Sequence, residues 1–328
     1  MRTLILGGTE FVGRAFVKEA LGRGWEVTTF NRQTHPAEEG VTSLRGNRWE
    51  PEGLAELADG DWDVVVDTWS WAPVAVREAA NFLASRADRY VYVSSRSVYD
   101  FPTASGADES AAVVESSPDL TEADYAASKA GGELAAIGAF DDRATLLRAG
   151  LILGPHENIG RLPWWLQRIA RGGDVLAPGT PDSGIQYIDA RDLARFGLDA
   201  AANGHGGPFN IVSPVGHATM GELLGACIEA TESDAVLRWV PTETVLAAGI
   251  EPWSQLPVWL PDGELHETLH EGDVSRALAA GLTIRPLRET VADTWKWLED
   301  VGDAPHRPDR PRLGLDPEVE TRVLRENL

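Results

Sequence analysis

The chain has 328 residues, 43% of them hydrophobic, and a formal net charge of −22. This length and composition allow one large domain or two ordinary ones with a well-buried core. The negative charge argues against a nucleic-acid or anionic-membrane partner, because either needs a basic patch. We expect no signal peptide, because the apolar N-terminal run is too short and enters a glycine turn instead of a cleavage site. We expect no membrane span, because no run reaches the roughly 18 apolar residues required. The single cysteine, Cys227, excludes an internal disulfide, lies in a helical pattern typical of a core, and favours a cytoplasmic location.

The first predicted elements form a strand–turn–helix unit. Thr3–Leu6 is typical of a buried strand, and Phe11–Leu21 has apolar residues at helical spacing. In such a unit, glycines let the backbone approach a pyrophosphate, and the helix N-terminus supplies free N–H groups. We therefore predict that a dinucleotide contacts the residues of the turn, namely Gly7, Gly8, Thr9, Glu10, Phe11, Val12 and Gly13.

Strands and helices continue to alternate up to residue 150. The further predicted strands are Glu26–Phe30, Val41–Leu44, Asp63–Asp67, Arg89–Ser95 and Ala144–Ala149. The further predicted helices are Pro51–Ala58, Pro73–Ala84 and Ala123–Ala139. This alternation predicts an α/β fold with a doubly wound parallel sheet, whose ligands bind beyond the carboxyl ends of the strands. Asp67, Thr68 and Ser95 stand at such ends, and we expect Asp67 and Thr68 to contact the cofactor.

The pattern loosens after Gly154-Pro155. It predicts a short strand at 186–189 and helices at Leu162–Ala170, Ala190–Ala202, Met220–Thr231 and Leu287–Leu298. From Asp303 the chain becomes a polar, proline-rich linker, and Asp316-Pro317 begins a short charged helix. We predict a dinucleotide-binding domain at 1–152, a smaller, mainly substrate-binding α/β part at 153–302, and a C-terminal linker and helix at 303–328.

Tyr125 and Lys129 stand four residues apart in a predicted helix, although the chain has few lysines. Positions i and i+4 share one face of a helix. An ammonium group beside a phenol favours the phenolate and so lowers the pKa of the tyrosine. A phenol adjusted in this way can exchange a proton with an alcohol or carbonyl oxygen.

These features together resemble the extended short-chain dehydrogenase/reductase superfamily. The resemblance is to its epimerase/dehydratase-like branch and, within it, to the Gly-Gly-Thr-x-Phe-x-Gly subgroup. It implies a Rossmann-like fold and an NAD(P)-dependent oxidoreductase that moves a hydride to or from an alcohol or ketone carbon of a small molecule. It also implies that Tyr125 is the acid/base, that Lys129 holds the nicotinamide ribose, and that Ser95, ahead of Val98-Tyr99, hydrogen-bonds the reacting oxygen.

The second strand indicates which cofactor is bound. NAD-specific sheets usually end this strand with an acidic residue that binds the ribose 2′-hydroxyl, whereas this chain has Asn31 and Arg32. An arginine can pair with a 2′-phosphate, so we predict a preference for NADP, with NAD possible. Relatives often have an adenine-contacting Asp where this chain has Asn47, and we expect Asn47 and Arg48 to contact the cofactor.

Departures from the family pattern indicate the substrate. Nucleotide-sugar enzymes commonly have Asn at the position of Leu151 and Arg at the position of Ile185, groups that hold a diphosphate. Sugar-nucleotide dehydratases carry an Asp-Glu pair where this chain has Arg96-Ser97, so 4,6-dehydration is not expected. Gly154-Pro155 is followed by His156, Glu157 and Arg161, which are placed to face a substrate.

Twelve tryptophans are many for this length. The tryptophans in predicted rim segments are Trp69, Trp71, Trp164, Trp165, Trp253 and Trp259. Aromatic walls with few fixed charges suit an uncharged, ring-containing ligand. The candidate substrate residues are therefore Trp69, Trp71, Arg96, Leu151, His156 and Trp164. No metal site is expected, because His266 and His270 lack a third ligand at a suitable spacing.

Two alternative functions remain open from the sequence. One is a sugar or nucleotide-sugar epimerase that oxidises its substrate transiently at the same tyrosine. The other is a non-enzymatic relative that senses the cofactor or binds RNA, although Tyr125 and the acidic composition argue against it. The expected partner is a small molecule, and the protein is expected to be a monomer or a homodimer.

Overall fold

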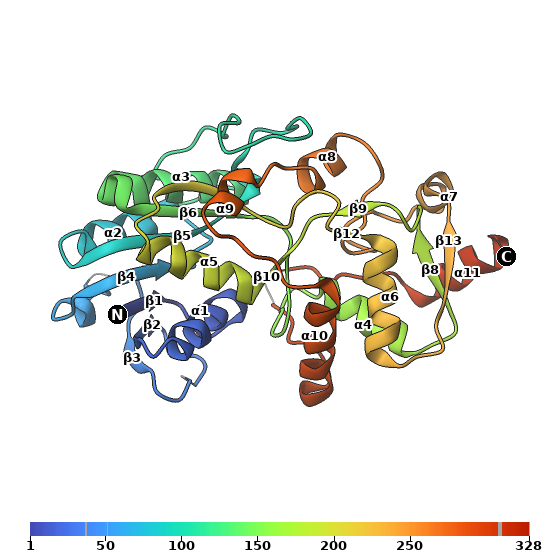
Figure 1. The fold of residues 1–328 in the computed structure, drawn as a ribbon, viewed down its shortest axis with the longest axis horizontal. Coiled ribbons are helices and arrows are strands. Elements are labelled where there is room, and N and C mark those ends of the chain that lie inside the picture. Colours follow the sequence, from blue (N-terminus) through green and yellow to red (C-terminus); the bar gives the residue numbers. More distant parts are fainter. Residues whose placement is uncertain (37, 51, 308–309, 328) are drawn as a thin grey trace.

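A seven-stranded parallel sheet forms the centre of the N-terminal half (Figure 1). The computed structural model describes residues 1–36, 38–50, 52–307 and 310–327. The strand order is β11-β6-β5-β4-β1-β2-β3, so the order reverses between β1 and β4. The strands are β1 (Arg2–Leu6), β2 (Glu26–Asn31), β3 (Thr42–Arg45), β4 (Trp62–Asp67), β5 (Ala87–Ser95), β6 (Ala144–Ala149) and β11 (Gly207–Ile211). This architecture confirms the predicted doubly wound α/β fold.

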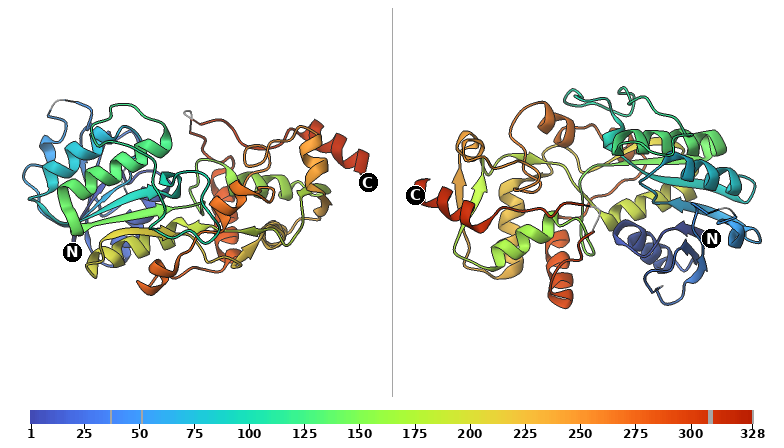
Figure 2. Two further views of the ribbon diagram at one scale, coloured as in Figure 1. Left: turned by 90° about the horizontal axis from the view of Figure 1, so that it is seen from above. Right: turned by 180° about the vertical axis from the view of Figure 1, so that it is seen from behind.

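Helices cover both faces of the sheet because its strands are apolar on both sides. In β1, Ile5 packs against one core, whereas Leu4 and Leu6 pack against the other, as the two-residue period of a strand requires. The first core contains α1 (Phe11–Gly22) and α5 (Ala190–Ala202). The second contains α2 (Pro73–Leu83) and α3 (Tyr125–Phe140). Figure 2 shows these two helical layers on either side of the sheet.

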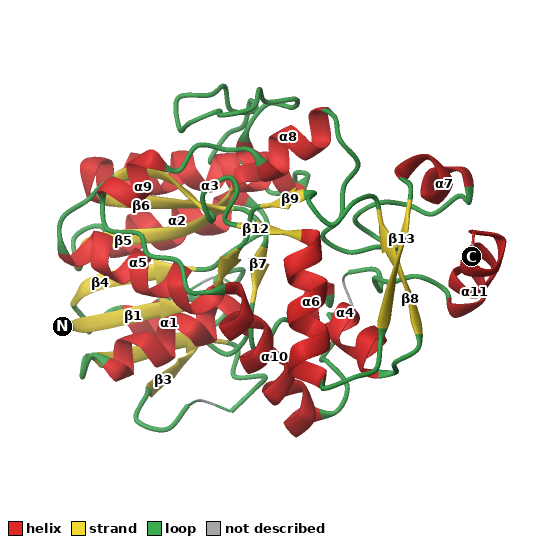
Figure 3. Cartoon of the chain, turned by 45° about the vertical axis from the view of Figure 1, so that its right-hand side comes forward, coloured by secondary structure: helices red, strands yellow, loops and turns green. Residues whose placement is uncertain are grey.

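A further hydrophobic core lies in the C-terminal half (Figure 3). It is built around α4 (Arg161–Ala170), α6 (Met220–Thr231) and α10 (Leu287–Val301). The parallel strands β8 (Asp174–Pro178) and β13 (Val236–Val240) flank these helices, and α11 (Pro317–Asn327) contacts β8. Trp165 and Trp259 are almost completely buried here, so they are packing residues and not rim residues as expected.

Short elements complete the chain. The remaining strands are β7 (Ile152–Leu153), β9 (Gly184–Ile185), β10 (Ile188–Asp189) and β12 (Ala218–Thr219). The remaining α-helices are α7 (Thr242–Ala247), α8 (Glu264–His270) and α9 (Ser275–Ala279). Three 3₁₀ turns are η1 (Ala55–Leu57), η2 (Arg96–Val98) and η3 (Asp141–Arg143).

The structure differs from the predicted elements in several places. The strand predicted at 186–189 is only β10, at Ile188–Asp189. The helix predicted from Pro51 is only the turn η1, and Pro51 itself lies outside the described residues. The helix predicted from Ala123 begins at Tyr125, because the Asp124 carboxylate accepts the Ala127 N–H at 2.8 Å and caps it. The seventh strand, β11, was not predicted, and it and α5 return the chain from the C-terminal half to the sheet.

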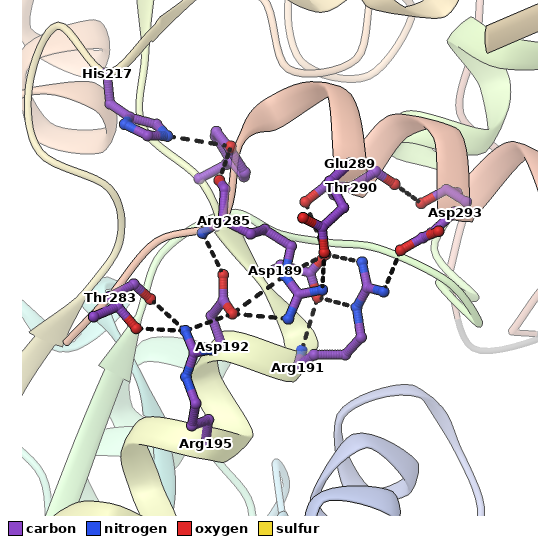
Figure 4. Close-up of polar contacts among 12 residues, drawn as sticks. Asp189, Arg191, Asp192, Arg195, His217, Thr283, Arg285, Glu289, Thr290 and Asp293 are labelled. Carbon is purple, nitrogen blue, oxygen red and sulfur yellow. Dashed lines mark hydrogen bonds and ion pairs between the residues drawn. The ribbon is translucent and has the colours of Figure 1, made fainter.

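An ion-pair cluster joins the two halves of the molecule (Figure 4). Asp189, at the N-terminus of α5, is fully buried and bonds Arg191 at 2.7 Å and Thr290 of α10 at 2.8 Å. Asp192 of α5 accepts from the Arg285 side chain at 2.9 Å. These bonds connect α5 to α10 and to the segment just before it. The cluster therefore links the sheet and the C-terminal core.

Two features bear on the expectations drawn from composition. Cys227 is fully buried in the C-terminal core, as its helical pattern predicted, and burial raises the pKa of its thiol far above its usual value. Among the described residues, no helix combines the length and the apolar character needed to cross a bilayer.

Candidate active site

Two adjoining cavities lie at the carboxyl ends of the strands. We call the cavity over β1, β2 and β4 the β2-side cavity and the cavity over β5, β6 and α3 the β5-side cavity; their volumes are about 460 and 430 Å³. The residues that line both are Glu10, Thr68, Ser70 and Arg307. Because the same four residues line both cavities, we describe the two together as one cleft. It lies at the point where the strand order reverses, and ligands of such sheets bind at this point.

The glycine turn forms the floor of this cleft. Gly8 has a φ of 95°, a conformation that disfavours residues with a Cβ. A Cβ at Gly13 would lie 2.7 Å from the Gly8 nitrogen, so only glycine lets α1 start this close to the turn. Residues 7–10 line the β2-side cavity, and residues 10–13 line the β5-side cavity. All seven turn residues predicted to contact the dinucleotide therefore face the cleft.

The end of β2 supports the turn and carries a cation. The Asn31 side chain donates to the Gly7 carbonyl at 3.0 Å and accepts from the Gln33 N–H at 2.7 Å. Its amide therefore holds two loops together. Arg32 is exposed and lines the β2-side cavity, as does Asn47. The charge that can reach a ribose substituent at this end belongs to Arg32.

Asp67 holds Arg48 in place and does not line the cleft itself. Its fully buried carboxylate accepts two hydrogen bonds from Arg48, at 3.0 and 3.1 Å, and one from the Tyr90 hydroxyl at 2.6 Å. Burial and the adjacent carboxylate raise the pKa of Tyr90 well above its usual value, so this phenol remains a donor. Arg48 stacks on Trp69 at 4.8 Å and lines the cavity. The predicted cofactor contact by Asp67 is therefore replaced by a positioning contact.

Tyr125 and Lys129 both line the β5-side cavity. Tyr125 is the first residue of α3 and its side chain is 39% exposed, whereas Lys129, one turn further on, is 1% exposed. The Lys129 ammonium donates to the carbonyls of Trp69 and Val93, both at 2.6 Å. Burial lowers the pKa of Lys129 to about 7. The amine is thus held at the wall of the cavity that Tyr125 also lines.

Ser95 is the last residue of β5 and contributes to the same wall. Its hydroxyl accepts the Ser97 N–H at 3.1 Å, which begins the turn η2. The neighbouring hydroxyl of Ser94 instead donates to Glu133 at 2.6 Å, and Glu133 pairs with Arg148 at 2.8 Å. Ser94 is therefore committed to a buried network, whereas the Ser95 hydroxyl donates to another hydroxyl of the cavity lining, that of Ser97, at 3.1 Å.

Four of the six predicted substrate residues line the cleft, and two do not. Trp69, Trp71, Arg96 and Leu151 line the cleft. His156 and Trp164 do not line either cavity: the His156 ring packs on Trp297 at 5.3 Å, and Trp164 packs edge-on against Trp165. The guanidinium of Arg96 donates to the carbonyls of Thr268 and Leu269, so its main contacts are structural.

The cleft is rich in positive charge, which contradicts the expected uncharged aromatic wall. Glu10 is its only carboxylate among the residues that the structure describes. The lining cations are Arg32, Arg48, Arg96, Lys129, Arg161, Arg307 and Arg310. In a chain with a net charge of −22, this local reversal favours anionic ligands.

Two of these cations come from the C-terminal segment, which sequence analysis treated as a linker. After α10 the chain runs back toward the boundary between the two halves before it reaches α11 (Figure 2). The Arg307 N–H donates to the Asn158 carbonyl at 3.3 Å, and Arg310 lies 5.5 Å from the Tyr125 ring. The only signal in the sequence was the density of arginines in an acidic chain.

The Glu157 side chain caps the N-terminus of α4, next to the cleft. It is fully buried, and its carboxylate accepts the N–H groups of Arg161 at 2.7 Å and Leu162 at 3.2 Å. Burial raises its pKa to about 7 from an ordinary value of 4.5, and these hydrogen bonds only partly oppose the shift. The acid therefore retains its proton in the folded state over a pH range in which it is ionised in the unfolded chain.

This raised pKa predicts a pH-dependent contribution of Glu157 to stability. The folded state binds more protons between pH 4.5 and 7, so the contribution is fully present below pH 4.5 and is lost as pH rises through 7. The loss amounts to about 3 kcal/mol. We expect the difference in unfolding free energy between wild type and E157Q, measured by urea denaturation, to fall across this range. A difference that stays constant with pH would contradict the raised pKa.

Comparison with known proteins identifies the family. The sequence model described as the NAD dependent epimerase/dehydratase family matches residues 3–212. The 2-alkyl-3-oxoalkanoate reductase of Stenotrophomonas maltophilia (strain K279a) is 30% identical over 275 residues, which are 76% of this chain and 81% of that protein. The chain belongs to the NAD dependent epimerase/dehydratase family.

Solved structures share the fold. UDP-glucuronic acid 4-epimerase from Bacillus cereus, in complex with NAD, superposes with a TM-score of 0.65 at 14% identity, covering 92% of this chain and 100% of that one. UDP-glucose 4-epimerase from Thermotoga maritima, with UDP-glucose, gives a TM-score of 0.64 at 18% identity and the same coverage. This chain is an NAD(P)-dependent enzyme of the short-chain dehydrogenase/reductase type, which excludes the non-enzymatic alternative.

Proposed function

We propose that the enzyme transfers a hydride between a nicotinamide cofactor and the ketone or alcohol carbon of a small organic acid, with Tyr125 as the acid/base. The observation that supports this is the meeting of three elements at one cavity. Ser95 comes from β5, Tyr125 and Lys129 come from α3, and the cavity continues into the glycine turn. The close approach of Gly13 to Gly8 fits a pyrophosphate at the N-terminus of α1.

A nicotinamide cofactor held at the glycine turn would supply the hydride to the carbonyl carbon in the reducing direction. Ser95 donates a hydrogen bond to the carbonyl oxygen and holds it toward Tyr125. Tyr125 then gives its phenolic proton to that oxygen as charge develops on it. Lys129 lines the same cavity with its ammonium anchored by two carbonyls, and its role would be to hold the nicotinamide ribose.

A net redox reaction is favoured over epimerisation by the reductase relative, whose name specifies a 3-oxoalkanoate, a ketone that also bears a carboxylate. The test is consumption of NADPH during incubation with a series of 3-oxoalkanoates. We expect stoichiometric oxidation of the cofactor and formation of the hydroxy acid. Epimerisation of a nucleotide sugar without net cofactor oxidation would instead support the alternative.

We propose NADP as the preferred cofactor because Arg32 lines the β2-side cavity, where the adenosine ribose would lie. We expect R32Q to weaken NADPH binding about tenfold to a hundredfold, the value of a charge-assisted hydrogen bond, and to leave NADH binding almost unchanged. Isothermal titration measures both. R45Q, an exposed arginine at the end of β3 that does not line the cavity, is the control. Equal losses for both cofactors would contradict this role.

A cytoplasmic location and a monomeric or homodimeric state complete the proposal. The single, fully buried cysteine fits a reducing compartment. Gel filtration with light scattering gives the oligomeric state directly.

A further inference from the structure

Arg161 is a cleft residue whose buried Nε atom has no hydrogen-bond partner. It is the first residue of α4 and lines the β5-side cavity together with Tyr125. Within the part of the chain that the structure describes, its guanidinium donates no hydrogen bond and forms no ion pair, and its Nε atom is buried without a partner. The guanidinium lies 5.4 Å from the centroid of the Trp253 ring.

The nearest carboxylate in the sequence, that of Glu157, accepts no hydrogen bond from this guanidinium. Glu157 directs its two oxygens at the backbone N–H groups of Arg161 and Leu162. Burial lowers the pKa of Arg161, and the positive charge of Arg310 lowers it further. Glu157 and Tyr125 raise this pKa and so partly oppose the shift. An unmet buried donor on a charged group costs free energy, and a bound anion would remove that cost.

We propose that Arg161 binds the carboxylate of the substrate and so selects oxo acids or hydroxy acids over neutral ketones and alcohols. This inference rests on the proposed function, because it assigns the substrate of the same cavity. The guanidinium lies against Trp253, and a planar edge of this kind matches the two oxygens of a carboxylate.

A phosphate fits this end of the cleft less well. Phosphates bind at helix N-termini through several free backbone N–H groups. In α4, the first N–H groups are already taken by the Glu157 carboxylate, which also adds negative charge there when ionised. The cavity wall around Arg161 also includes the apolar residues Leu151, Ile152, Ile159, Trp253 and Leu269. A carboxylate on an aliphatic chain satisfies both the guanidinium and this wall.

The test is a binding experiment that does not require turnover. The enzyme–NADP⁺ complex is titrated with octanoate, with octanamide as its neutral counterpart, and with inorganic phosphate, and tryptophan fluorescence is followed. We expect saturable binding of octanoate and at least about tenfold weaker binding of octanamide and phosphate. R161M should weaken octanoate binding by about the same factor and leave octanamide unchanged. R171M, which removes an exposed arginine outside the cleft, is the matched control.

The unfolding midpoint of the unliganded protein separates binding from a structural role. Replacing an unpaired, partly buried charge by an apolar side chain of similar length is neutral or stabilising. We therefore expect the midpoint of R161M to equal or exceed that of wild type. A lowered midpoint, octanoate binding that R161M does not change, or tighter binding of phosphate than of octanoate would each overturn the proposal.

Activity measurements distinguish failure of the proposed redox function from failure of the carboxylate site. Y125F should bind octanoate as wild type does, because it keeps Arg161, while losing turnover of 3-oxooctanoate. If wild type binds octanoate through Arg161 but oxidises no NADPH with any oxo acid, the carboxylate site stands and the redox proposal fails. If it reduces octan-2-one as well as 3-oxooctanoate, the redox proposal stands and the carboxylate site fails.

Discussion

Y125F is expected to reduce kcat for an oxo acid by about 10² to 10⁴-fold, the usual contribution of a positioned acid/base. The phenol is the group of the β5-side cavity that can supply a proton where the oxygen of a substrate would lie, between Ser95 and α3. The substitution removes only the hydroxyl. Because Lys129 and the glycine turn remain, binding of NADPH should stay within about twofold of wild type.

Y187F provides the matched control for this experiment. The Tyr187 hydroxyl bonds the Arg285 carbonyl at 3.3 Å in the C-terminal core and does not line the cleft. We expect its kcat to stay close to that of wild type. Steady-state kinetics with both variants at several pH values make the comparison. A kcat for Y125F within a few-fold of wild type would remove Tyr125 from the mechanism.

K129A is expected to lower kcat by about 10²-fold and also to weaken cofactor binding, since the ammonium acts on both the phenol and the ribose. The structure adds a consequence that the sequence did not predict. The carbonyls of Trp69 and Val93 lose their shared donor, so the unfolding midpoint should fall as well. Thermal melting and titration with NADPH measure the two losses separately.

Chemical rescue distinguishes these effects of Lys129. The cavity left by K129A opens into the cleft, so propylammonium can enter it and restore a cation. We expect saturable recovery of kcat with propylammonium and none with the neutral propanol. Recovery of stability without recovery of rate would show that Lys129 is a structural residue only.

Local patterns were sufficient to predict the elements that carry the motifs. Apolar spacing gave the bounds of α5 and α6 without error, and the glycine turn was placed at the correct strand end. Such segments have strong periodicity and clear end signals, so tertiary contacts do not override them. The helix cap at Asp124 is also a local signal, because its partner lies three residues away, but the helix was predicted to begin at Ala123.

Features that depend on distant contacts were not predicted. β11 begins with Gly207-Pro208, a sequence typical of a turn, and becomes a strand only by pairing with β6. Asp67 was read as a cofactor ligand, but Arg48, 19 residues earlier, occupies its carboxylate. No local pattern can show that the segment carrying Arg307 and Arg310 returns to the cleft, or that the guanidinium of Arg161 lacks a partner.

Transfer of deuterium tests whether the enzyme moves a hydride from the cofactor to the substrate with Tyr125 as the acid. Wild type and Y125F are each mixed with NADPH that carries deuterium at both C4 positions of the nicotinamide and with 3-oxooctanoate, and the product is analysed by mass spectrometry after a single turnover. We expect wild type to place the label on the carbinol carbon of the hydroxy acid. We expect Y125F to form this labelled product at least about a hundredfold more slowly. Label transferred at the same rate by both proteins, or product without label, would contradict this mechanism.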